Sequence, residues 1–315
     1  MVLAAGRGSR LQPLTASVPK PALPFMGIPM LRLAMKNVWD AGASSMHVNA
    51  WHLPDRIHEA LEGVEERSTI EVHVENRLLG TAGGIHNALG RSPEGEVLVH
   101  NGDVLFCGSL APLVEEHRKS GALASLGLIC VEDPSVPRSV HCDSEGRIFD
   151  FRGDDRAKGW TFSGIHVLSA AIFEHIVEEG CIVADVYRRF LKDGLIRGVP
   201  LQGTWADLGT IDRFREMHLQ VLKSSTLRTF IRPDLKEMAS VHPEASLASS
   251  VVLEAPYCIE AGAIIGEDVR IGPNCFVGAG AQVEAGARLS NSVVLPFSRA
   301  KGQKVEELCF ETLPD

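Results

Sequence analysis

The feature that most constrains this chain is a period of six in its last third. From Val241 onward, an aliphatic residue recurs every six positions without a break. The ten positions are Val241, Leu247, Leu253, Ile259, Ile265, Ile271, Val277, Val283, Leu289 and Leu295. A helix with about 3.6 residues per turn does not give this spacing, and neither does a flat strand with a period of about two. A coil of three six-residue faces does, because the aliphatic position then points into a narrow prism.

A second set of residues follows the same period, four positions after the first nine of these. Its members are mostly small or β-branched: Ala245, Val251, Tyr257, Ala263, Val269, Cys275, Ala281, Ala287 and Val293. Glycines suit the corners of such a coil: Gly266, Gly272, Gly278 and Gly286. The pattern resembles the hexapeptide-repeat left-handed β-helix family. It predicts a β-helix with a tail over residues 239–315, of little more than three coils.

The preceding two thirds of the chain predict a different architecture. Short β-rich runs alternate with helical stripes, which indicates a Rossmann-like α/β domain with a mostly parallel sheet over residues 1–224. The expected strands are Ser45–Asn49, Thr69–Glu75, Glu96–His100, Ala122–Cys130 and Thr161–Leu168. The expected helical stripes are 31–38, Leu110–His117, Ile172–Val177, Val186–Leu191 and Phe214–Leu222. Residues 225–238, which are polar and contain Pro233, are the expected linker.

Charge and cysteine content exclude several function classes. The formal charge of -9 argues against a general nucleic-acid or anionic-membrane binder, which needs a positive field. Seven scattered cysteines without a CxxC pair indicate neither a disulfide framework nor a zinc cluster. No apolar stretch reaches the ~18 residues of a membrane span. We therefore expect a cytoplasmic protein whose partners include neither nucleic acid nor membrane.

A glycine-rich segment opens the chain and carries the first candidate site. The segment Leu3–Leu11 reads LAAGRGSRL, and Pro19–Pro24 follows as PKPALP. The two glycines allow backbone N–H groups to approach a phosphate chain, and Arg10 and Lys20 bring positive charge. The loop begins after only five residues, so the first strand is expected to be short.

Four more segments carry candidate residues. They are Leu79–Gly84 (LGTAGG), Asn101–Asp103 (NGD), Thr161–Ile165 (TFSGI) and Trp205–Thr210 (WADLGT). The NGD segment follows an expected strand at its carboxyl end, where open α/β sheets bind ligands. Asn49 also closes a strand, and either faces the cleft or is a hydrogen-bonded strand-end residue.

Together these segments resemble the signature of the sugar-1-phosphate nucleotidyltransferases, in matching order. The resemblance implies transfer of a nucleotidyl group from a nucleoside triphosphate to a sugar-1-phosphate. It implies catalytic roles for Arg10, Lys20 and Asp103 and nucleotide contacts from Ala4, Ala5, Gly6, Gly8, Arg10, Gly80, Thr81, Ala82 and Gly83. It implies sugar contacts from Asn101, Gly102, Phe162, Ser163 and Gly164, and an Mg²⁺ ion held by Asp103 and Asp207. Their convergence is implied by the resemblance and not by spacing.

The nucleotide and the sugar stay open at this stage. The GTAG string after a leucine and the added β-helix resemble mannose-1-phosphate guanylyltransferases, which we place first. TAGG, TFSGI and the lack of a Glu-Lys-Pro segment resemble N-acetylmuramate-1-phosphate uridylyltransferases. Residues that would replace the missing sugar-phosphate lysine are Arg152, Arg156 and Lys158.

Two rival functions make different use of the same fold. A catalytically silent regulatory subunit would bind a nucleotide sugar, but Arg10, Lys20, Asp103 and Asp207 are all present. A bifunctional acyltransferase would need a histidine base in the coils, where only His242 occurs, at the first turn. We therefore expect the β-helix to serve packing and assembly of a homo-oligomer, with Tyr257 and Phe276 exposed on its faces.

Overall fold

A computed structural model describes residues 1–65, 69–91, 93–155, 158–235 and 237–312. The chain forms two compact units. The first comprises Met1–Gly8, Ser17–Ala22 and Met30–Trp205; the second comprises Ser9–Ala16, Leu23–Pro29 and the chain from Ala206 onward. Within the described ranges, no helix combines the length and the apolar character needed to cross a membrane.

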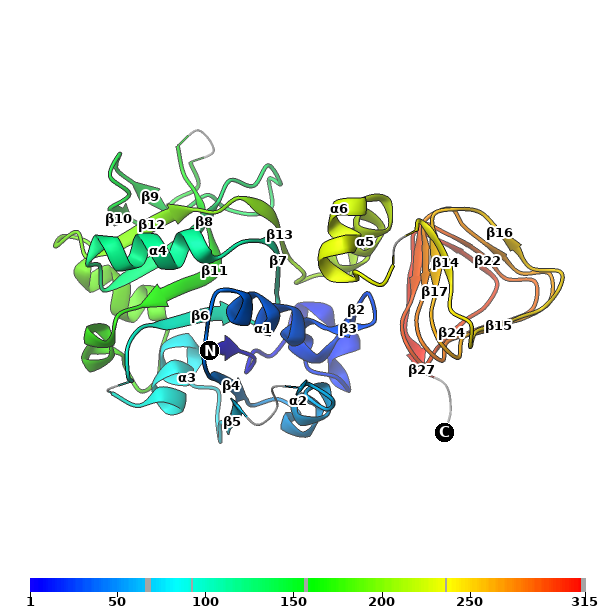
Figure 1. Cartoon of the computed structure of the whole chain (residues 1–315), viewed down its shortest axis with the longest axis horizontal. Helices are drawn as coiled ribbons and strands as arrows, with labels where there is room; N and C mark the ends of the chain where they lie inside the picture. The colour runs from blue at the N-terminus through cyan, green and yellow to red at the C-terminus, as the bar shows by residue number, and fades with distance from the viewer. Residues whose placement is uncertain (66–68, 92, 156–157, 236, 313–315) are drawn as a thin grey trace. The chain divides into compact units, whose positions relative to one another are not determined.

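A seven-stranded sheet forms the centre of the first unit, with the strand order β12-β8-β11-β6-β1-β4-β5 (Figure 1). The strands are β1 (Val2–Leu3), β4 (Met46–Ala50), β5 (Ile70–Val74), β6 (Val97–Asn101), β8 (Ala124–Ile129), β11 (Thr161–Leu168) and β12 (Ile196–Pro200). Strands β6, β1, β4 and β5 run parallel to one another, whereas β11 is antiparallel to both β6 and β8. The sheet is therefore mostly parallel, as predicted, and β11 is its antiparallel strand.

Other elements of the first unit cover this sheet or extend from it. They are η3 (Lys20–Ala22), α1 (Met30–Asp40), α2 (Pro54–Ala60), α3 (Gly80–Leu89), β7 (Val104–Gly108), α4 (Ala111–Ser120), β9 (His141–Cys142), β10 (Ile148–Asp150), η5 (Ala170–His175), η6 (Ile182–Val186) and η7 (Tyr187–Phe190). Strand β13 (Gly203–Asp207) leads from the first unit into the second.

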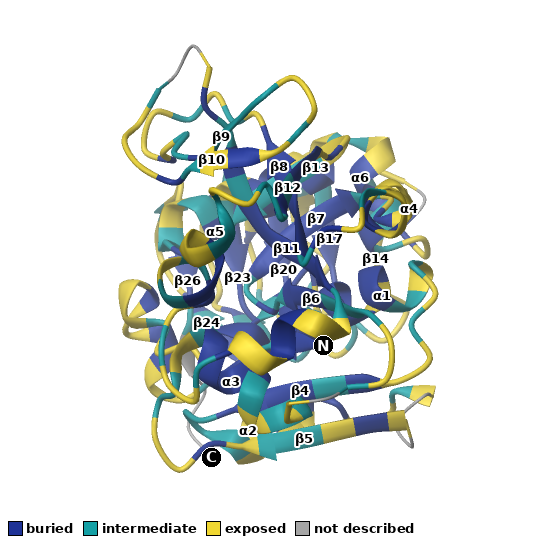
Figure 2. Ribbon diagram, turned by 90° about the vertical axis from the view of Figure 1, so that its left-hand side faces the viewer, coloured by how far each residue is buried: buried dark blue, intermediate teal, exposed yellow. Residues whose placement is uncertain are grey.

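Apolar side chains bury both faces of the sheet. One core joins α1 and α2 to β1 and β4, through residues such as Leu31, Val38 and Val48. Another joins α3, η5 and η6 to β6, β8 and β12, through residues such as Ile85 and Phe173. The central strands are mostly dark blue in Figure 2, whereas the edge strand β5 is mostly intermediate or exposed, with Ile70 as its buried residue. A sheet covered on both faces leaves its strand ends as the place where polar groups gather.

The period of six produces the predicted parallel β-helix in the second unit. Its strands form three sheets, β14-β17-β20-β23-β26, β15-β18-β21-β24-β27 and β16-β19-β22-β25. The strands are β14 (Ala239–Val241), β15 (Ser246–Leu247), β16 (Val252–Leu253), β17 (Tyr257–Ile259), β18 (Ile264–Ile265), β19 (Arg270–Ile271), β20 (Cys275–Val277), β21 (Gln282–Val283), β22 (Arg288–Ser290), β23 (Ser292–Val294), β24 (Ser298–Ala300), β25 (Gln303–Val305), β26 (Leu308–Cys309) and β27 (Glu311–Thr312). Tyr257 pairs with Cys275 and Ile265 with Val283, so one coil contains three hexads. This arrangement fits the left-handed β-helix class.

The predicted core positions fill the inside of the coils. Ile259, Ile265, Ile271 and Val277 are all nearly inaccessible to solvent. The first three positions are the exceptions: Val241 is 39% exposed, and Leu247 and Leu253 are only half-buried, because β14, β15 and β16 are edge strands with a neighbouring coil on one side. A repeat stack buries its core between neighbours, so its first coil is the least buried.

Two helices of the second unit pack beside the coils. Helix α5 (Ile211–Lys223) contacts strands β20, β23 and β26, and α6 (Ser225–Ile231) packs against α5. This unit also contains η1 (Ser9–Leu11), η2 (Leu14–Ala16), β2 (Pro24–Phe25) and β3 (Ile28–Pro29). The ring of Phe276 lies 5.4 Å from the ring of His218 on α5 and is fully buried. The expectation that Phe276 is exposed for assembly is therefore wrong, because α5 covers this face; Tyr257 is half-buried.

Several predicted elements differ from the observed ones. Helix α6 occupies the first half of the expected linker. Its N-terminus is capped by Ser224, whose hydroxyl accepts the N–H of Leu227. The expected helices at Ile172–Val177 and Val186–Leu191 are instead the 3₁₀ turns η5 and η7, with the π-helical turn η6 before η7. The first strand is short, as expected, and the predicted domain boundaries themselves stay a prediction.

A buried histidine in the second unit gives a testable pH dependence. His218 lies among the rings of Phe25, Phe214 and Phe276, and its Nε2 accepts the N–H of Met26. Burial lowers its pKa from 6.5 to about 4. As the pH falls below about 6.5, His218 is protonated in the unfolded chain but stays neutral in the folded protein. The free energy of unfolding therefore decreases until the pH reaches the folded-state pKa of about 4. The expected loss is about 1.4 kcal/mol per pH unit in that window.

Urea unfolding at about pH 7.5 and about pH 5 tests this expectation. The wild-type chain should lose about 2 kcal/mol more of its unfolding free energy between these pH values than His218→Gln does. Equal losses in the two proteins would show that His218 does not titrate in this way.

Candidate functional site

The glycine-rich segment follows β1, at the point where the strand order of the sheet reverses. Strand β1 sits between β6 and β4, and the chain continues from β1 to β4 on one side and reaches β6 on the other. Leu3 pairs with Asn101, and the N–H of Gly102 donates to the carbonyl of Leu3 at 2.8 Å. The ends of β1 and β6 therefore lie side by side. Open α/β sheets bind ligands at such a switch point, outside the carboxyl ends of the strands.

The glycine loop itself is open at Gly6. Gly6 is exposed, its φ is not in the left-handed region, and a Cβ built on it would meet no other atom within 4 Å. Neither packing nor backbone conformation of the protein requires a glycine there. Gly8 differs, because its φ is 62° and favours glycine. The guanidinium of Arg7 lies 5.5 Å from the ring centre of Trp51, a residue that the sequence alone did not single out.

Lys20 and Asp103, 83 residues apart, meet in the first unit. The Nζ of Lys20 donates to Oδ2 of Asp103 at 2.8 Å. The Lys20 side chain is only 5% exposed, whereas that of Asp103 is 37% exposed. A buried ammonium is poorly screened by water, so its field acts strongly on a nearby anion. Two residues predicted to be catalytic are thus brought into direct contact.

Two buried residues, Asn49 and Glu75, form hydrogen bonds that hold the start of the glycine loop. The N–H of Ala4 donates to Asn49 Oδ1 at 2.7 Å, and Asn49 Nδ2 donates to Glu75 Oε1 at 2.7 Å. The N–H of Leu79 donates to Glu75 Oε2 at 3.1 Å. Asn49 is therefore a hydrogen-bonded strand-end residue, the second of its two expected states. Sequence reasoning missed Glu75, although an acidic residue directly after a half-buried strand was a usable signal.

The LGTAGG segment begins helix α3 and packs closely on another turn. A Cβ on Gly80, whose φ is 75°, would lie 2.4 Å from the carbonyl oxygen of Gly180, and one on Gly83 would lie 2.5 Å from that of Glu178. The hydroxyl of Thr81 accepts the N–H of Ile182 at 2.9 Å, and Ala82 is fully buried. Close packing within the protein thus accounts for Gly80 and Gly83, and contacts of this segment with a nucleotide stay a prediction.

The candidate sugar residues lie around the ends of β6 and β11. A Cβ on Gly164 would lie 2.7 Å from Asn101 Nδ2, so Gly164, Asn101 and Gly102 are neighbours. Ser163 is fully buried; its hydroxyl accepts the N–H of Ile165, and its carbonyl accepts Nε1–H of Trp205. Phe162 is half-buried. All five residues, Asn101, Gly102, Phe162, Ser163 and Gly164, stay predicted sugar contacts, and Ser163 also forms hydrogen bonds within the protein.

Arg10 and Asp207 meet in the second unit. A nitrogen of the Arg10 guanidinium lies 3.5 Å from Asp207 Oδ2, and Arg213 Nη1 lies 3.9 Å from the same oxygen. A Cβ on Gly209 would lie 2.8 Å from the Arg10 guanidinium and 2.9 Å from Asp207 Oδ1, so a larger residue there would displace these side chains. Arg213, at the start of α5, was not predicted. Asp207 belongs to the second unit and its side chain is 26% exposed. Asp103 belongs to the first unit and its side chain is 37% exposed.

The residues proposed to replace a sugar-phosphate lysine lie between β10 and β11. Arg152 is 78% exposed and lies 3.8 Å from Asp150, and Lys158 is exposed. Arg156 lies outside the described residues. The described contacts of Arg152 and Lys158 do not test this role, so the replacement of the lysine stays a prediction.

Known proteins resemble this chain in sequence, and solved structures resemble part of it in fold. Residues 1–224 match the family model described as nucleotidyl transferase. The chain is 30% identical over 279 residues to a mannose-1-phosphate guanylyltransferase of Mycobacterium tuberculosis, covering 86% of this chain and 77% of that protein. It is 24% identical to a UTP–glucose-1-phosphate uridylyltransferase of Synechocystis, over 95% of this chain and 83% of that protein. The crystal structure of HddC from Yersinia pseudotuberculosis with GMP-PN has a TM-score of 0.58 at 22% identity, over 68% of this chain and 95% of that one.

Proposed function

This chain belongs to the nucleotidyl transferase family, among the sugar-1-phosphate nucleotidyltransferases, and we propose that it makes GDP-mannose and pyrophosphate from GTP and mannose-1-phosphate. The observation that carries the site is the open Gly6 loop at the switch point, with the Lys20–Asp103 pair in the same unit. The choice of substrates is supported by the guanylyltransferase of Mycobacterium tuberculosis, which matches most of both chains.

In the proposed reaction, an oxygen of the sugar-1-phosphate attacks the α-phosphorus of the triphosphate in line, and pyrophosphate leaves. The nucleophile is already an anion, so neither a protein base nor a covalent intermediate is needed. The backbone at Gly6 gives the phosphate chain room to approach. Lys20 and Arg10 supply positive charge to phosphate oxygens, and catalysis rests on positioning and charge neutralisation.

Asp103 and Asp207 would hold the Mg²⁺ ion. Both side chains are partly exposed carboxylates, and hard oxygen donors in small number suit an ion that keeps several waters and substrate oxygens. Bound Mg²⁺ would neutralise charge on the phosphates. Lys20 orients the Asp103 carboxylate, whereas Arg10 and Arg213 lie beside that of Asp207.

A uridylyltransferase is the second candidate. It is favoured by the TAGG and TFSGI strings, by the absent Glu-Lys-Pro segment and by the Synechocystis relative. N-acetylmuramate-1-phosphate and glucose-1-phosphate are the sugar phosphates to test with UTP.

A substrate panel separates the candidates. Pyrophosphate release is measured with each of GTP, UTP, dTTP, ATP and CTP against mannose-, glucose- and N-acetylmuramate-1-phosphate. The highest kcat/KM is expected for GTP with mannose-1-phosphate. A higher value for a UTP pair would replace the proposal with the second candidate, and no turnover with any pair would favour the silent regulatory subunit.

We also propose that the enzyme is a cytoplasmic homo-oligomer. All seven cysteines are free thiols, which fits a reducing compartment. The β-helix supports assembly through its remaining exposed side chains, such as Val252 and Ile264, which are 48% and 51% exposed. Light scattering should give a mass of at least two chains, and a monomer in dilute buffer would contradict the assembly role.

A further inference from the structure

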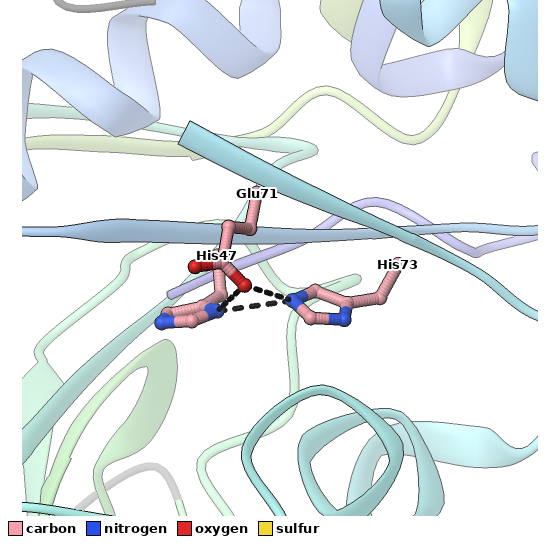
Figure 3. A group of neighbouring side chains, drawn as sticks. All are labelled: His47, Glu71 and His73. Carbon is pink, nitrogen blue, oxygen red and sulfur yellow. Dashed lines mark hydrogen bonds and ion pairs between the residues drawn. The ribbon is translucent and has the colours of Figure 1, made fainter. Parts of the chain in front are cut away.

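Two adjacent strands at the edge of the seven-stranded sheet present a His-Glu-His cluster that the proposed reaction does not use. His47 lies on β4, and Glu71 and His73 lie on the edge strand β5. The register pairs His47 with Glu71 and Asn49 with His73. Since alternate residues of a strand share a face, these side chains project from the same side of the sheet. Figure 3 shows the two imidazole rings and the carboxylate turned toward one another.

The three donor atoms stand at distances that suit a metal ion. His47 Nδ1 lies 3.0 Å from His73 Nε2, and Glu71 Oε2 lies 3.8 Å from each of these nitrogens. A triangle with these sides has a point about 2.1 Å from all three atoms, and this is the usual length of zinc bonds to imidazole nitrogen and carboxylate oxygen. The cluster therefore needs little rearrangement to enclose an ion.

A bond between the two imidazoles explains only part of this arrangement. One ring can donate to the other at 3.0 Å, but the Glu71 oxygen is too far from both nitrogens for a hydrogen bond. Burial lowers the pKa of His47, which favours the neutral ring that a metal requires. The imidazoles are half-buried, whereas the Glu71 side chain is 71% exposed, so an ion can enter from solvent.

We propose that His47, Glu71 and His73 bind one divalent ion of the zinc class, separate from the Mg²⁺ of the proposed reaction. Two imidazoles and one carboxylate form a donor set for Zn²⁺, Co²⁺ or Ni²⁺, while Mg²⁺ prefers oxygen ligands. A water molecule would complete a four-coordinate shell.

The bound ion would fasten the edge strand to its neighbour. Within the part of the chain that the structure describes, β5 pairs with β4 alone, and the ion would link one side chain of β4 to two of β5. The same strands lead to Asn49 and Glu75, which hold Ala4 and Leu79 in place. The ion is therefore expected to stabilise the fold beneath the glycine loop, by mass action on the folded state.

Metal content and a cobalt spectrum test the site. Untagged protein is stripped with EDTA and dialysed against micromolar Zn²⁺ with millimolar Mg²⁺, so that oxygen sites such as Asp103 are occupied by Mg²⁺. One equivalent of zinc is expected, and Co²⁺ in its place should give a visible absorption band typical of four-coordinate ligation. His47→Ala and His73→Ala should each weaken binding by about 10-fold or more, since each removes a ligand. Bound zinc should also raise the melting temperature.

Two further variants keep the result interpretable. Glu71→Gln changes an exposed side chain, so it leaves the fold intact and should weaken zinc binding without the risk of unfolding. His58→Ala, an exposed histidine on α2, is the matched control and should bind zinc as the wild type does. Circular dichroism of the metal-free variants checks the fold. The proposal is overturned if the wild-type chain binds no zinc under these conditions, or if the His47, His73 and Glu71 variants bind it as tightly as His58→Ala.

Discussion

Asp103→Asn is expected to lower kcat/KM by about 100-fold or more. Asp103 is proposed to hold the Mg²⁺ ion that neutralises the reacting phosphates, and loss of such charge stabilisation commonly has an effect of this size. Asparagine keeps the shape of the side chain and an oxygen that can accept from Lys20. Its neutral amide is a poor ligand for Mg²⁺ beside the carboxylate it replaces. Pyrophosphate release as a function of Mg²⁺ concentration measures the change.

Asparagine is more informative here than alanine. Alanine at position 103 would remove the carboxylate beside an ammonium that is only 5% exposed, and this loss would destabilise the fold as well as the reaction. Asp40→Asn is the matched control, because Asp40 pairs with Lys36 on the exposed face of α1 and should leave activity unchanged. Asp207→Asn tests the second carboxylate in the same assay. Turnover within about tenfold of the wild type would refute the role of the carboxylate concerned.

Gly6→Val should remove activity while leaving stability nearly unchanged. In the protein alone a Cβ at this position has no other atom within 4 Å, which leaves open space for the side chain, so the unfolding free energy should change by about 0.5 kcal/mol or less. A phosphate chain in the loop would meet the new methyl groups, and displacement by about 1 Å can lower the rate on the order of 100-fold. Steady-state kinetics with the triphosphate varied and urea unfolding are measured on the same preparation.

Gly80→Ala provides the contrasting variant. Its Cβ would lie 2.4 Å from the carbonyl of Gly180 at a left-handed φ, so stability should fall by about 1 kcal/mol or more. The open glycine is thus expected to affect activity and the packed glycine stability. Wild-type kinetics for Gly6→Val would show that triphosphate does not approach this part of the loop.

Local periodicity made most of the architecture predictable. The six-residue period places one aliphatic residue per face of the coil, so residues such as Ile265 and Val283 could be assigned to the core before any contact was known. Strand Thr161–Leu168 was predicted with its observed ends. Helix α6 was not predicted, although Ser224 offered a local N-cap, and the burial of Phe276 was not predicted because the packing of α5 on the coils joins residues far apart in the chain.

For the candidate site, too, some features follow from the sequence and others only from the tertiary structure. The sequence by itself determined the chemical types available, namely glycines, basic residues and carboxylates in short strings, and the roles in binding phosphate and metal were implied by the resemblance of the glycine loop, NGD and WADLGT to a family signature. Only the tertiary structure decided that Lys20 contacts Asp103, that Arg10 lies beside Asp207, and that Glu75 braces the loop through Asn49.

The His47–Glu71–His73 cluster shows the physical reason most clearly. Each of its residues is an ordinary member of a strand, and no spacing in the sequence marks them as a set. They converge because β4 and β5 pair in parallel with His47 opposite Glu71, and a shift of one residue would turn the side chains of β5 to the other face. Sequence patterns of short range fix which face of an element is apolar, whereas strand order and register decide which polar side chains meet.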